Sequence, residues 1–360
     1  MNSSETVHRV KESPRGGPIR IGFVPLCDCA PVAMAHELGL FAAQGLRVEL
    51  SREVGWATIR DKLVMRDLEA AHAPAAMVLG ISLGLGSFKV PCVTALVLNL
   101  HGNAITLSNR LWQAGVRDAA SLRDYIRSNR NGSMLTFGVA FSCSSHNFLL
   151  QKWLRAGGLD PEREVNVVVV PPPQMASNLK AHNLDGYSVG EPWNSVAVVQ
   201  RAGWVAATSS DIALRHPEKV LLVRADFAES RHDEHRRLIA ALREACEFCE
   251  HPGNRERVAR TLAAPKYLNT SKEAIRRSLS GPFKFSKERL EPVPGFHVFA
   301  GSEVNEPGPD KAAWVRDSLV QSGVLPKSNG LDQHRLASMF RLDLFESSVA
   351  TTNLSSGVLA

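Results

Sequence analysis

The sequence predicts an α/β protein of two lobes, and three observations support this fold class. Over the first two-thirds of the 360 residues, short apolar segments alternate with amphipathic ones, as in folds with a mainly parallel sheet. The chain is about twice as long as a common domain. Hydrophobic residues make up 44% and charged residues 22%, which excludes a mostly disordered chain and favours a sizeable buried core.

The elements of a first α/β unit follow from apolar runs and their flanking residues. Its first strand is expected at 20–24, and a helix then begins at Pro31 and stops before Gly45. Further strands are expected at 47–50, 69–71 and 93–98, with helices at 56–66 and 75–85.

A segment at 105–107 is expected to cross into a second unit with the same alternation. Its helices are predicted at 121–127, 146–156, from Gln174, and at 191–202, and its strands at 136–139, 166–170, 185–189 and 204–207. A return strand at 220–223 precedes helices at 234–250, 254–263, 272–279, 311–322 and 333–340, and a long wrapped loop occupies 281–310.

This order predicts two lobes joined by two crossings, with a ligand cleft between the lobes. Lobe 1 would comprise 18–106 and 209–345, including a C-terminal helical extension, and lobe 2 would comprise 107–208. Segments 1–17 and 346–360 are polar or rich in small residues and are expected to be disordered. Because ligands bind beyond the carboxyl ends of strands in such sheets, the cleft between the lobes is the expected ligand site.

Charge and cysteine content narrow the class of partner and the compartment. The net charge of +6 is spread along the chain, so no basic arm for direct nucleic-acid binding is expected, and no apolar run suits a membrane span. Residues 1–17 lack the apolar core of a secretory signal, so a cytoplasmic location with six reduced cysteines is expected.

Several loops that follow predicted strands carry polar groups beside helix starts. They contain Trp56, Gly102 with Asn103, His146 and Gln174. A helix N-terminus offers unpaired N–H groups and a partial positive charge, so several of them facing one cleft predict a site for a small anion.

Each candidate also has a purely structural interpretation, and the sequence leaves both open. His72 could bond a loop carbonyl, Gly102 could serve only a turn, and Gln174 could cap its helix. Trp56 is of a type more often found in a core than against a ligand.

Motifs of common enzyme classes are absent from the sequence. There is no GxxxxGK[ST], HExxH or GxSxG, and the pair Gly84 and Gly86 lacks the third glycine of a dinucleotide fingerprint. A binding protein without a catalytic residue, cofactor or metal is therefore expected.

The chain resembles the NrtA/CmpA family of nitrate- and bicarbonate-binding proteins over about residues 18–340. The resemblance implies a two-lobed periplasmic-binding-protein fold (type II), which agrees with the two lobes and two crossings expected from the order of the elements. The segments that carry this resemblance include GFVPLCDCAPVAMAHELGLF at 22–41, AAHAPAAM at 70–77, PPPQM at 171–175 and DGYSVGEPWN at 185–194. Within the family it is most similar to the cytoplasmic NasS-type nitrate/nitrite sensors. The resemblance implies that the ligand-free protein sequesters NasT, an RNA-binding antiterminator of the ANTAR class that controls nitrate-assimilation genes.

The resemblance also implies a set of anion-binding residues, and this chain departs from the set at one point. Gly102 and Asn103 match a Gly-Asn turn that binds the anion, and His146 and Gln174 match side chains of the second lobe. Relatives also use a Lys from a later helix, but residues 238–250 contain no Lys, and Arg243 is their only cation. This departure keeps bicarbonate open as a ligand.

The sequence leaves two rival functions open. One is a substrate-binding component of a nitrate, bicarbonate or sulfonate ABC transporter, and the other is an enzyme on the same fold. An exported location would favour the first, and a residue consumed in turnover would favour the second.

Overall fold

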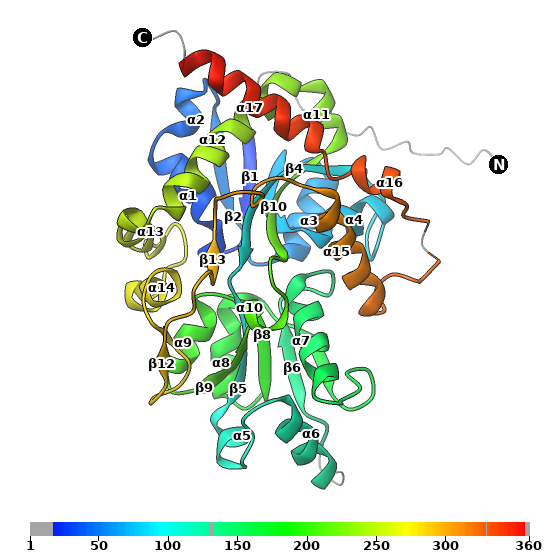
Figure 1. Cartoon of the computed structure of the whole chain (residues 1–360), viewed down its shortest axis with the longest axis vertical. Coiled ribbons are helices and arrows are strands. Elements are labelled where there is room, and N and C mark those ends of the chain that lie inside the picture. The colour runs from blue at the N-terminus through cyan, green and yellow to red at the C-terminus, as the bar shows by residue number, and fades with distance from the viewer. Residues whose placement is uncertain (1–16, 130–132, 329, 357–360) are drawn as a thin grey trace, which may run out of the picture.

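The chain folds into two lobes, each built around its own β-sheet and placed one above the other in Figure 1. The computed structural model describes residues 17–129, 133–328 and 330–356. The strand order is β13-β4-β10-β3-β1-β2 in lobe 1 and β7-β6-β8-β5-β9 in lobe 2. The prediction of a two-lobed α/β fold is therefore confirmed.

The sheet of lobe 1 is mixed rather than mainly parallel. Its strands are β1 (Ile19–Phe23), β2 (Val48–Arg52), β3 (Ala70–Pro74), β4 (Cys92–His101), β10 (Pro217–Arg224) and β13 (His297–Val298). β1 pairs in parallel with β2 and β3, whereas β10 runs antiparallel between β3 and β4. β3, β4 and β10 are buried along their whole length, because helices cover both faces of the sheet.

Two groups of helices cover the faces of this sheet, as Figure 1 shows. The first group packs into one core and comprises α1 (Ala30–Glu37), α2 (Leu40–Ala43), α11 (Ala225–Ser230), α12 (His232–Glu250), α13 (Arg255–Leu262) and α17 (Leu342–Ser356). The second group packs into another core and comprises α3 (Trp56–Val64), α4 (Ala76–Leu83), α15 (Pro309–Gln321) and α16 (Gln333–Ala337). α14 (Lys272–Leu279) leads from lobe 1 towards α9 of lobe 2.

Lobe 2 repeats the layered arrangement on a smaller scale. Its strands are β5 (Asn103–Ser108), β6 (Thr136–Val139), β7 (Asn166–Val169), β8 (Gly186–Gly190) and β9 (Gly203–Thr208). Its helices are α5 (Asn109–Gln113), α6 (Ala119–Ser128), α7 (Ser145–Ala156), α8 (Met175–Lys180), α9 (Trp193–Val199) and α10 (Ser209–Ile212). β7 lies at the sheet edge with all four residues exposed, although its sequence is almost entirely apolar.

The chain passes between the lobes twice, once from β4 to β5 and once from α10 to β10. The first passage is a single residue, Gly102, whose φ of +94° lies in the region that favours glycine. Residues 103–106, assigned to lobe 1 from the sequence, pair with β8 and β9 and thus belong to the sheet of lobe 2. The predicted crossing at 105–107 therefore lies inside a strand, because β4 and β5 form one nearly continuous apolar run.

A third segment, 283–298, also contacts both lobes, and we call it the strap. It contains β11 (Phe283–Lys284), β12 (Leu290–Glu291) and the first residues of the return to lobe 1 in β13. Phe283, Phe285 and Phe296 pack against lobe 2, and the Val205 N–H donates to the Phe285 carbonyl at 2.7 Å. The loop predicted at 281–310 is therefore fixed to the second lobe before it returns.

The two terminal segments that were predicted to be disordered, 1–17 and 346–360, differ in how far the structure describes them. Most of segment 1–17 lies outside the described residues; Gly17 is described, and its carbonyl accepts a hydrogen bond from Arg231 at 2.7 Å. The segment predicted to be disordered at 346–360 is helical as far as Ser356, because Phe345 buries its ring in the core beside α12. Among the described residues, no helix has the length and apolar character needed to span a membrane.

Candidate functional site

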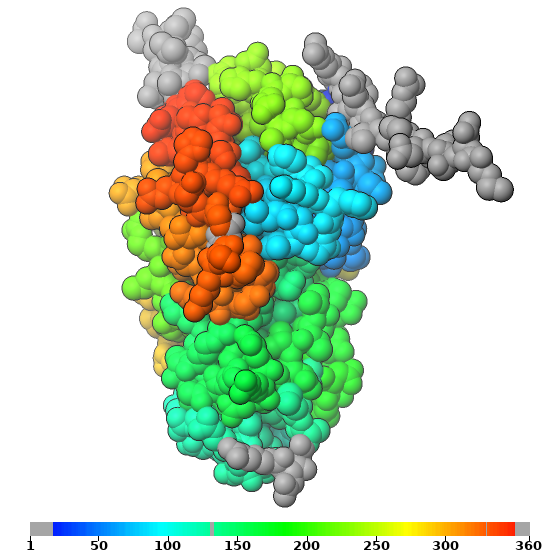
Figure 2. All heavy atoms as spheres, turned by 90° about the vertical axis from the view of Figure 1, so that its right-hand side faces the viewer, coloured from blue at the N-terminus to red at the C-terminus, as the bar shows by residue number. Residues whose placement is uncertain are grey.

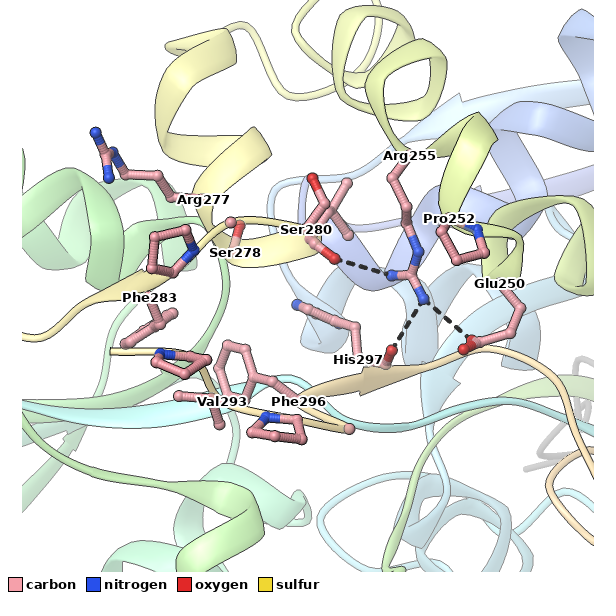
Figure 3. A pocket seen from close by; sticks show the side chains of 16 residues that line it. Glu250, Pro252, Arg255, Arg277, Ser278, Ser280, Phe283, Val293, Phe296 and His297 are labelled. Atoms are coloured by element: carbon pink, nitrogen blue, oxygen red, sulfur yellow. Dashed lines mark hydrogen bonds and ion pairs between the residues drawn. The ribbon is translucent and has the colours of Figure 1, made fainter. Parts of the chain in front are cut away.

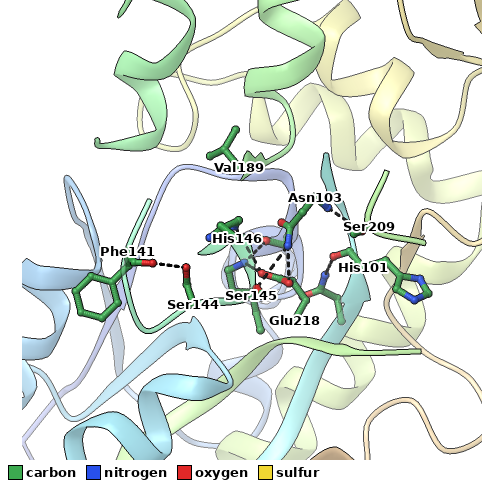
Figure 4. A network of polar contacts seen from close by, with 12 residues as sticks. His101, Asn103, Phe141, Ser144, Ser145, His146, Val189, Ser209 and Glu218 are labelled. Atoms are coloured by element: carbon green, nitrogen blue, oxygen red, sulfur yellow. Dashed lines mark hydrogen bonds and ion pairs between the residues drawn. The ribbon is translucent and has the colours of Figure 1, made fainter. Parts of the chain in front are cut away.

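A cluster of polar side chains is enclosed where the two lobes meet, and part of it is drawn in Figure 4. No member exposes more than 1% of its surface. We call it the junction cluster, and its members are Asp28, His72, Asn103, His146, Glu218 and Lys219. Burying so many polar groups is costly unless they are paired or serve a ligand, so the contacts of each decide its role.

Lys219 is the cationic centre of the junction cluster. Its Nζ lies 2.7 Å from Asp28 Oδ2 and also contacts Glu218 Oε1. His72 Nε2 lies 2.9 Å from the other oxygen of Asp28. Both carboxylates are therefore engaged with partners of lobe 1, and the lysine charge is held in a fixed place.

The local sequence explains how lobe 1 presents these groups. Asp28 lies in a 3-10 helix, Cys27–Cys29, directly after β1, and His72 lies in the middle of β3. Glu218 and Lys219 begin β10, the strand that returns from lobe 2, and the apolar residues after them anchor β10 in the core. The strand start thus lies at the lobe junction.

Lobe 2 closes the cluster from the other side. Asn103, the first residue of β5, donates from Nδ2 to Glu218 Oε2 at 2.6 Å. His146, in the first turn of α7, stacks on Trp56 of α3 with ring centres 5.3 Å apart. Because Trp56 belongs to lobe 1 and His146 to lobe 2, this stacked pair spans the two lobes.

Burial and the lysine charge together set the protonation of these groups. Burial would raise the pKa of Asp28, but Lys219 and His72 outweigh it and hold that pKa at about 2. Burial would likewise raise the pKa of Glu218, and Lys219 holds it well below its usual value. Burial and the nearby Lys219 lower the pKa of His146 to about 4, so its ring is neutral at physiological pH.

Several polar atoms of the site have no hydrogen-bond partner among the described residues. They are Trp56 Nε1, His146 Nδ1 and Asn103 Oδ1. The first turn of α7, where His146 lies, adds backbone N–H groups and the positive end of a helix dipole. With Lys219 Nζ 5.1 Å from the centre of the Trp56 ring, the arrangement suits a small oxyanion held by N–H donors beside a buried cation.

The structure brings most of the predicted site residues to this junction. Trp56, His72, Asn103 and His146 meet in or beside the junction cluster, and Gly102 adjoins Asn103 with its carbonyl accepting from the Glu191 N–H at 3.0 Å. Gln174 is exposed before α8, where its carbonyl accepts from Ser177 and Asn178. Arg243 lies on α12, which packs against α1 and α17.

Three members of the junction cluster, Asp28, Glu218 and Lys219, were not among the predicted anion-binding residues. Arg243 of the later helix, 238–250, was predicted as the cation, whereas the buried Lys219 lies on the return strand β10. A signal was present in the sequence, because Glu218 and Lys219 stand together at the start of the apolar run VLLV. A charged pair at the start of a strand that is otherwise buried needs partners, and a crossing beside a cleft supplies them.

A separate pocket of about 620 Å³ lies between the strap and the helices of lobe 1 (Figure 3). Its most buried cation, Arg255, donates to the carbonyls of Leu279 and His297 and pairs with Glu250 at 3.1 Å. None of the residues predicted for the anion site lines this pocket. The junction cluster is therefore the better candidate for an anion site.

Comparison with known proteins shows the family to which the chain belongs. The family model described as the NMT1-like family matches residues 12–263. The chain belongs to the NMT1-like family. It is 30% identical to the nitrate/nitrite binding protein NrtA of Synechococcus elongatus, over 88% of this chain and 74% of the relative. The crystal structure of the periplasmic nitrate-binding protein NrtA from Synechocystis PCC 6803 matches with a TM-score of 0.88 at 27% identity, covering 93% of this chain and 88% of that one.

Other relatives of this NMT1-like chain are larger proteins. It is 39% identical to the nitrate import ATP-binding protein NrtC of Synechocystis sp. and 38% identical to the bicarbonate transport ATP-binding protein CmpC of Synechococcus elongatus. These matches cover 85% and 86% of this chain but only 46% of each relative. The chain thus spans about half the length of these two relatives, whose names concern nitrate and bicarbonate.

Four buried histidines are expected to make this NMT1-like protein sensitive to acid. Burial lowers the pKa of His101, His146 and His235 to about 4 and of His297 to about 3. Below pH 6.5 the unfolded chain therefore binds protons at these rings that the folded chain does not, and stability falls as the pH falls. Burial also raises the pKa of Glu191 to about 7. This shift increases stability as the pH falls, but it involves one group, whereas the destabilising shifts involve four.

We expect the free energy of unfolding to fall steeply between about pH 6.5 and pH 4, since each pKa unit corresponds to about 1.4 kcal/mol per group. Urea denaturation at several pH values measures this slope. His235→Phe should reduce the dependence of the free energy of unfolding on pH, because it removes one of the buried rings. His235 lies on α12 away from the junction cluster, and the exposed His334→Phe serves as the control. Equal free energies of unfolding at pH 7 and pH 4.5 would show that the buried histidines do not make the folded protein sensitive to acid.

Proposed function

We propose that the protein is a nitrate- and nitrite-binding regulatory protein that holds the anion between its lobes without altering it chemically. The observation that carries this proposal is Lys219, a fully buried cation at the lobe junction. Beside it, Trp56 Nε1 and His146 Nδ1 have no hydrogen-bond partner among the described residues. A planar oxyanion has only acceptors, and it needs N–H donors and one positive charge.

The relatives support this class of ligand. Two of the proteins to which the chain is similar are named as nitrate or nitrite binders, and another is named for bicarbonate transport. Asn103, His146 and Lys219 contribute from both lobes, so an anion at the junction would favour the closed arrangement.

In the proposed mechanism the ligand-free protein sequesters a NasT-type ANTAR RNA-binding antiterminator, and the anion releases it. The partner must therefore contact the open arrangement better than the closed one. By linkage, the partner then weakens anion binding by the same factor as the anion weakens partner binding. A coupling of about 1–3 kcal/mol gives a change of about 5- to 150-fold, enough for a graded switch.

We further propose that the protein acts in the cytoplasm. All six cysteines are free and buried, and neither pair of neighbours, Cys27 with Cys29 or Cys246 with Cys249, forms a disulfide. Free thiols are typical of a reducing compartment.

The alternative is a substrate-binding component of an ABC transporter for nitrate, bicarbonate or sulfonate. The high structural similarity to a periplasmic nitrate-binding protein favours it. Fractionation of cells that express the protein from its native locus separates the two functions, because a transporter component would be exported and a sensor retained.

A thermal-shift panel of nitrate, nitrite, bicarbonate and sulfate tests the ligand class. A ligand that binds only the folded state stabilises it by about RT ln(1 + [L]/Kd), so a tight anion raises the melting temperature in proportion to the logarithm of its concentration. We expect nitrate and nitrite to raise it and sulfate to leave it unchanged. A rise with bicarbonate alone would reject the nitrate assignment.

A further inference from the structure

A groove of about 500 Å³ runs along the outside of the molecule between α7 of lobe 2 and α15 of lobe 1. Figure 2 faces this side, with α15 in orange directly above the green helices of lobe 2. The residues that line it are Phe148, Leu149, Lys152, Arg155, Trp314, Asp317, Ser318, Gln321 and Ser322. Because each wall belongs to a different lobe, the width of the groove depends on how the lobes are arranged.

The lobe 2 wall of the groove is continuous with the anion site. α7 carries His146 in its first turn and the groove residues Phe148 and Lys152 in the turns that follow. A helix moves as a rigid element, so an anion that draws His146 towards Lys219 also moves this wall.

The lobe 1 wall reaches the same site through a short chain of contacts. The Trp314 ring of α15 stacks on the buried His216 ring, with centres 5.2 Å apart. His216 Nε2 lies 3.3 Å from Glu218 Oε2, the oxygen that accepts from Asn103. Each wall of the groove is therefore connected to the junction cluster. The lobe 2 wall is connected through α7, and the lobe 1 wall through Trp314 and His216.

We propose that this groove is the docking surface for the regulatory partner, and that it accepts an amphipathic helix with carboxylates along one edge of an apolar stripe. The inference rests on the proposed function. Phe148 and Leu149 lie beneath the floor of the groove, exposed by only 6% and 2%, and the half-buried Trp314 ring of the other wall supplies most of its accessible apolar contact. Lys152 and Arg155 are exposed on the lobe 2 wall. Arg155 lies 3.6 Å from the exposed Glu162, a weak surface pair, so Lys152 directly and Arg155 by exchange of this pair would bind acidic residues of the partner.

Distance measurements between spin labels test whether the groove responds to the anion. All six native cysteines are buried, so labels can be directed to Lys152→Cys and Gln321→Cys on opposite walls. We expect nitrate to change this distance and to leave unchanged that of a control pair within lobe 2, Lys152→Cys with Ser128→Cys. An unchanged distance across the groove, in protein shown by calorimetry to bind nitrate, would overturn the inference.

Binding of the NasT-type partner tests the docking itself. The double variant Lys152→Glu and Arg155→Glu should weaken partner binding by about tenfold or more, while its nitrate affinity stays at the wild-type value. The matched control, Lys180→Glu with Lys287→Glu, makes the same charge change at exposed sites outside the groove and should bind the partner normally.

The outcomes separate failure of the docking surface from failure of the proposed function. If the partner binds the wild type and the groove variant equally well, the groove is not its docking surface, although the regulatory function stands. If nitrate binds the wild type but the partner does not bind it at all, both the regulatory function and the docking surface are rejected.

Discussion

Replacing Lys219 by methionine is expected to lower the free energy of unfolding by about 3–5 kcal/mol, the range typical of breaking a buried ion pair. The substitution leaves Asp28 and Glu218, exposed by 1% or less, without the charge that holds their pKa values low. Both carboxyls then tend to take up protons. The loss of stability should therefore shrink as the pH falls towards 5, and urea denaturation of the variant at two pH values measures this.

A matched lysine and a compensated variant make this prediction specific. Lys272 pairs with Glu256 at 3.0 Å, but both side chains are about half exposed, so Lys272→Met should cost less than about 1 kcal/mol. Adding Asp28→Asn and Glu218→Gln to Lys219→Met removes all three charges together and should recover part of the lost stability. A Lys219→Met protein as stable as the wild type would show that the buried charges are not coupled.

Replacing Gly102 by alanine is expected to have the second-largest effect, because two penalties add at the crossing between the lobes. The φ of +94° disfavours any residue with a Cβ, by about 1–2 kcal/mol. A Cβ at this position would also lie 2.4 Å from the His297 ring, so the strap or the crossing would have to shift, at a further cost of about 1–3 kcal/mol. We expect reduced stability and weaker nitrate binding, since the carbonyl of Gly102 also fixes Glu191 of lobe 2.

Gly115 is a close control for this substitution. Its φ is +91°, but a Cβ there would meet nothing within 4 Å. Gly115→Ala should therefore show only the backbone penalty and leave nitrate affinity unchanged. If both variants lose the same free energy of unfolding in urea denaturation, the close approach of a Cβ at position 102 to the His297 ring does not contribute to the loss of stability.

The fold could be predicted well from the sequence because local patterns specify most of its elements. The strand predicted at 136–139 and the helix at 272–279 match β6 and α14 in both bounds. The crossing could not be located in this way, since β4 and β5 are both apolar and only Gly102 separates them. The edge strand β7 shows a similar limit, because a run of valines predicts a strand but not whether another strand will cover it.

The candidate site was predicted only in part, for a physical reason. Trp56, Asn103 and His146 follow strands or begin helices, and this topology places such residues at the cleft. Lys219 lies within a strand, and its position at the junction depends on pairing with β3 and β4 far away in the sequence. The tail predicted as disordered became helical for a similar reason, because one buried ring, Phe345, fixes α17 on a distant helix.

Calorimetric titration of nitrate into the wild type and into His146→Phe tests whether the anion binds at the junction of the lobes. Phenylalanine can keep the stack on Trp56 but lacks the ring nitrogens, so it removes a ligand contact with little effect on packing. We expect one nitrate site per wild-type molecule and an affinity at least about tenfold weaker in the variant, the loss expected for a charge-assisted hydrogen bond. Equal nitrate affinity in the two proteins would contradict a site at the junction of the lobes.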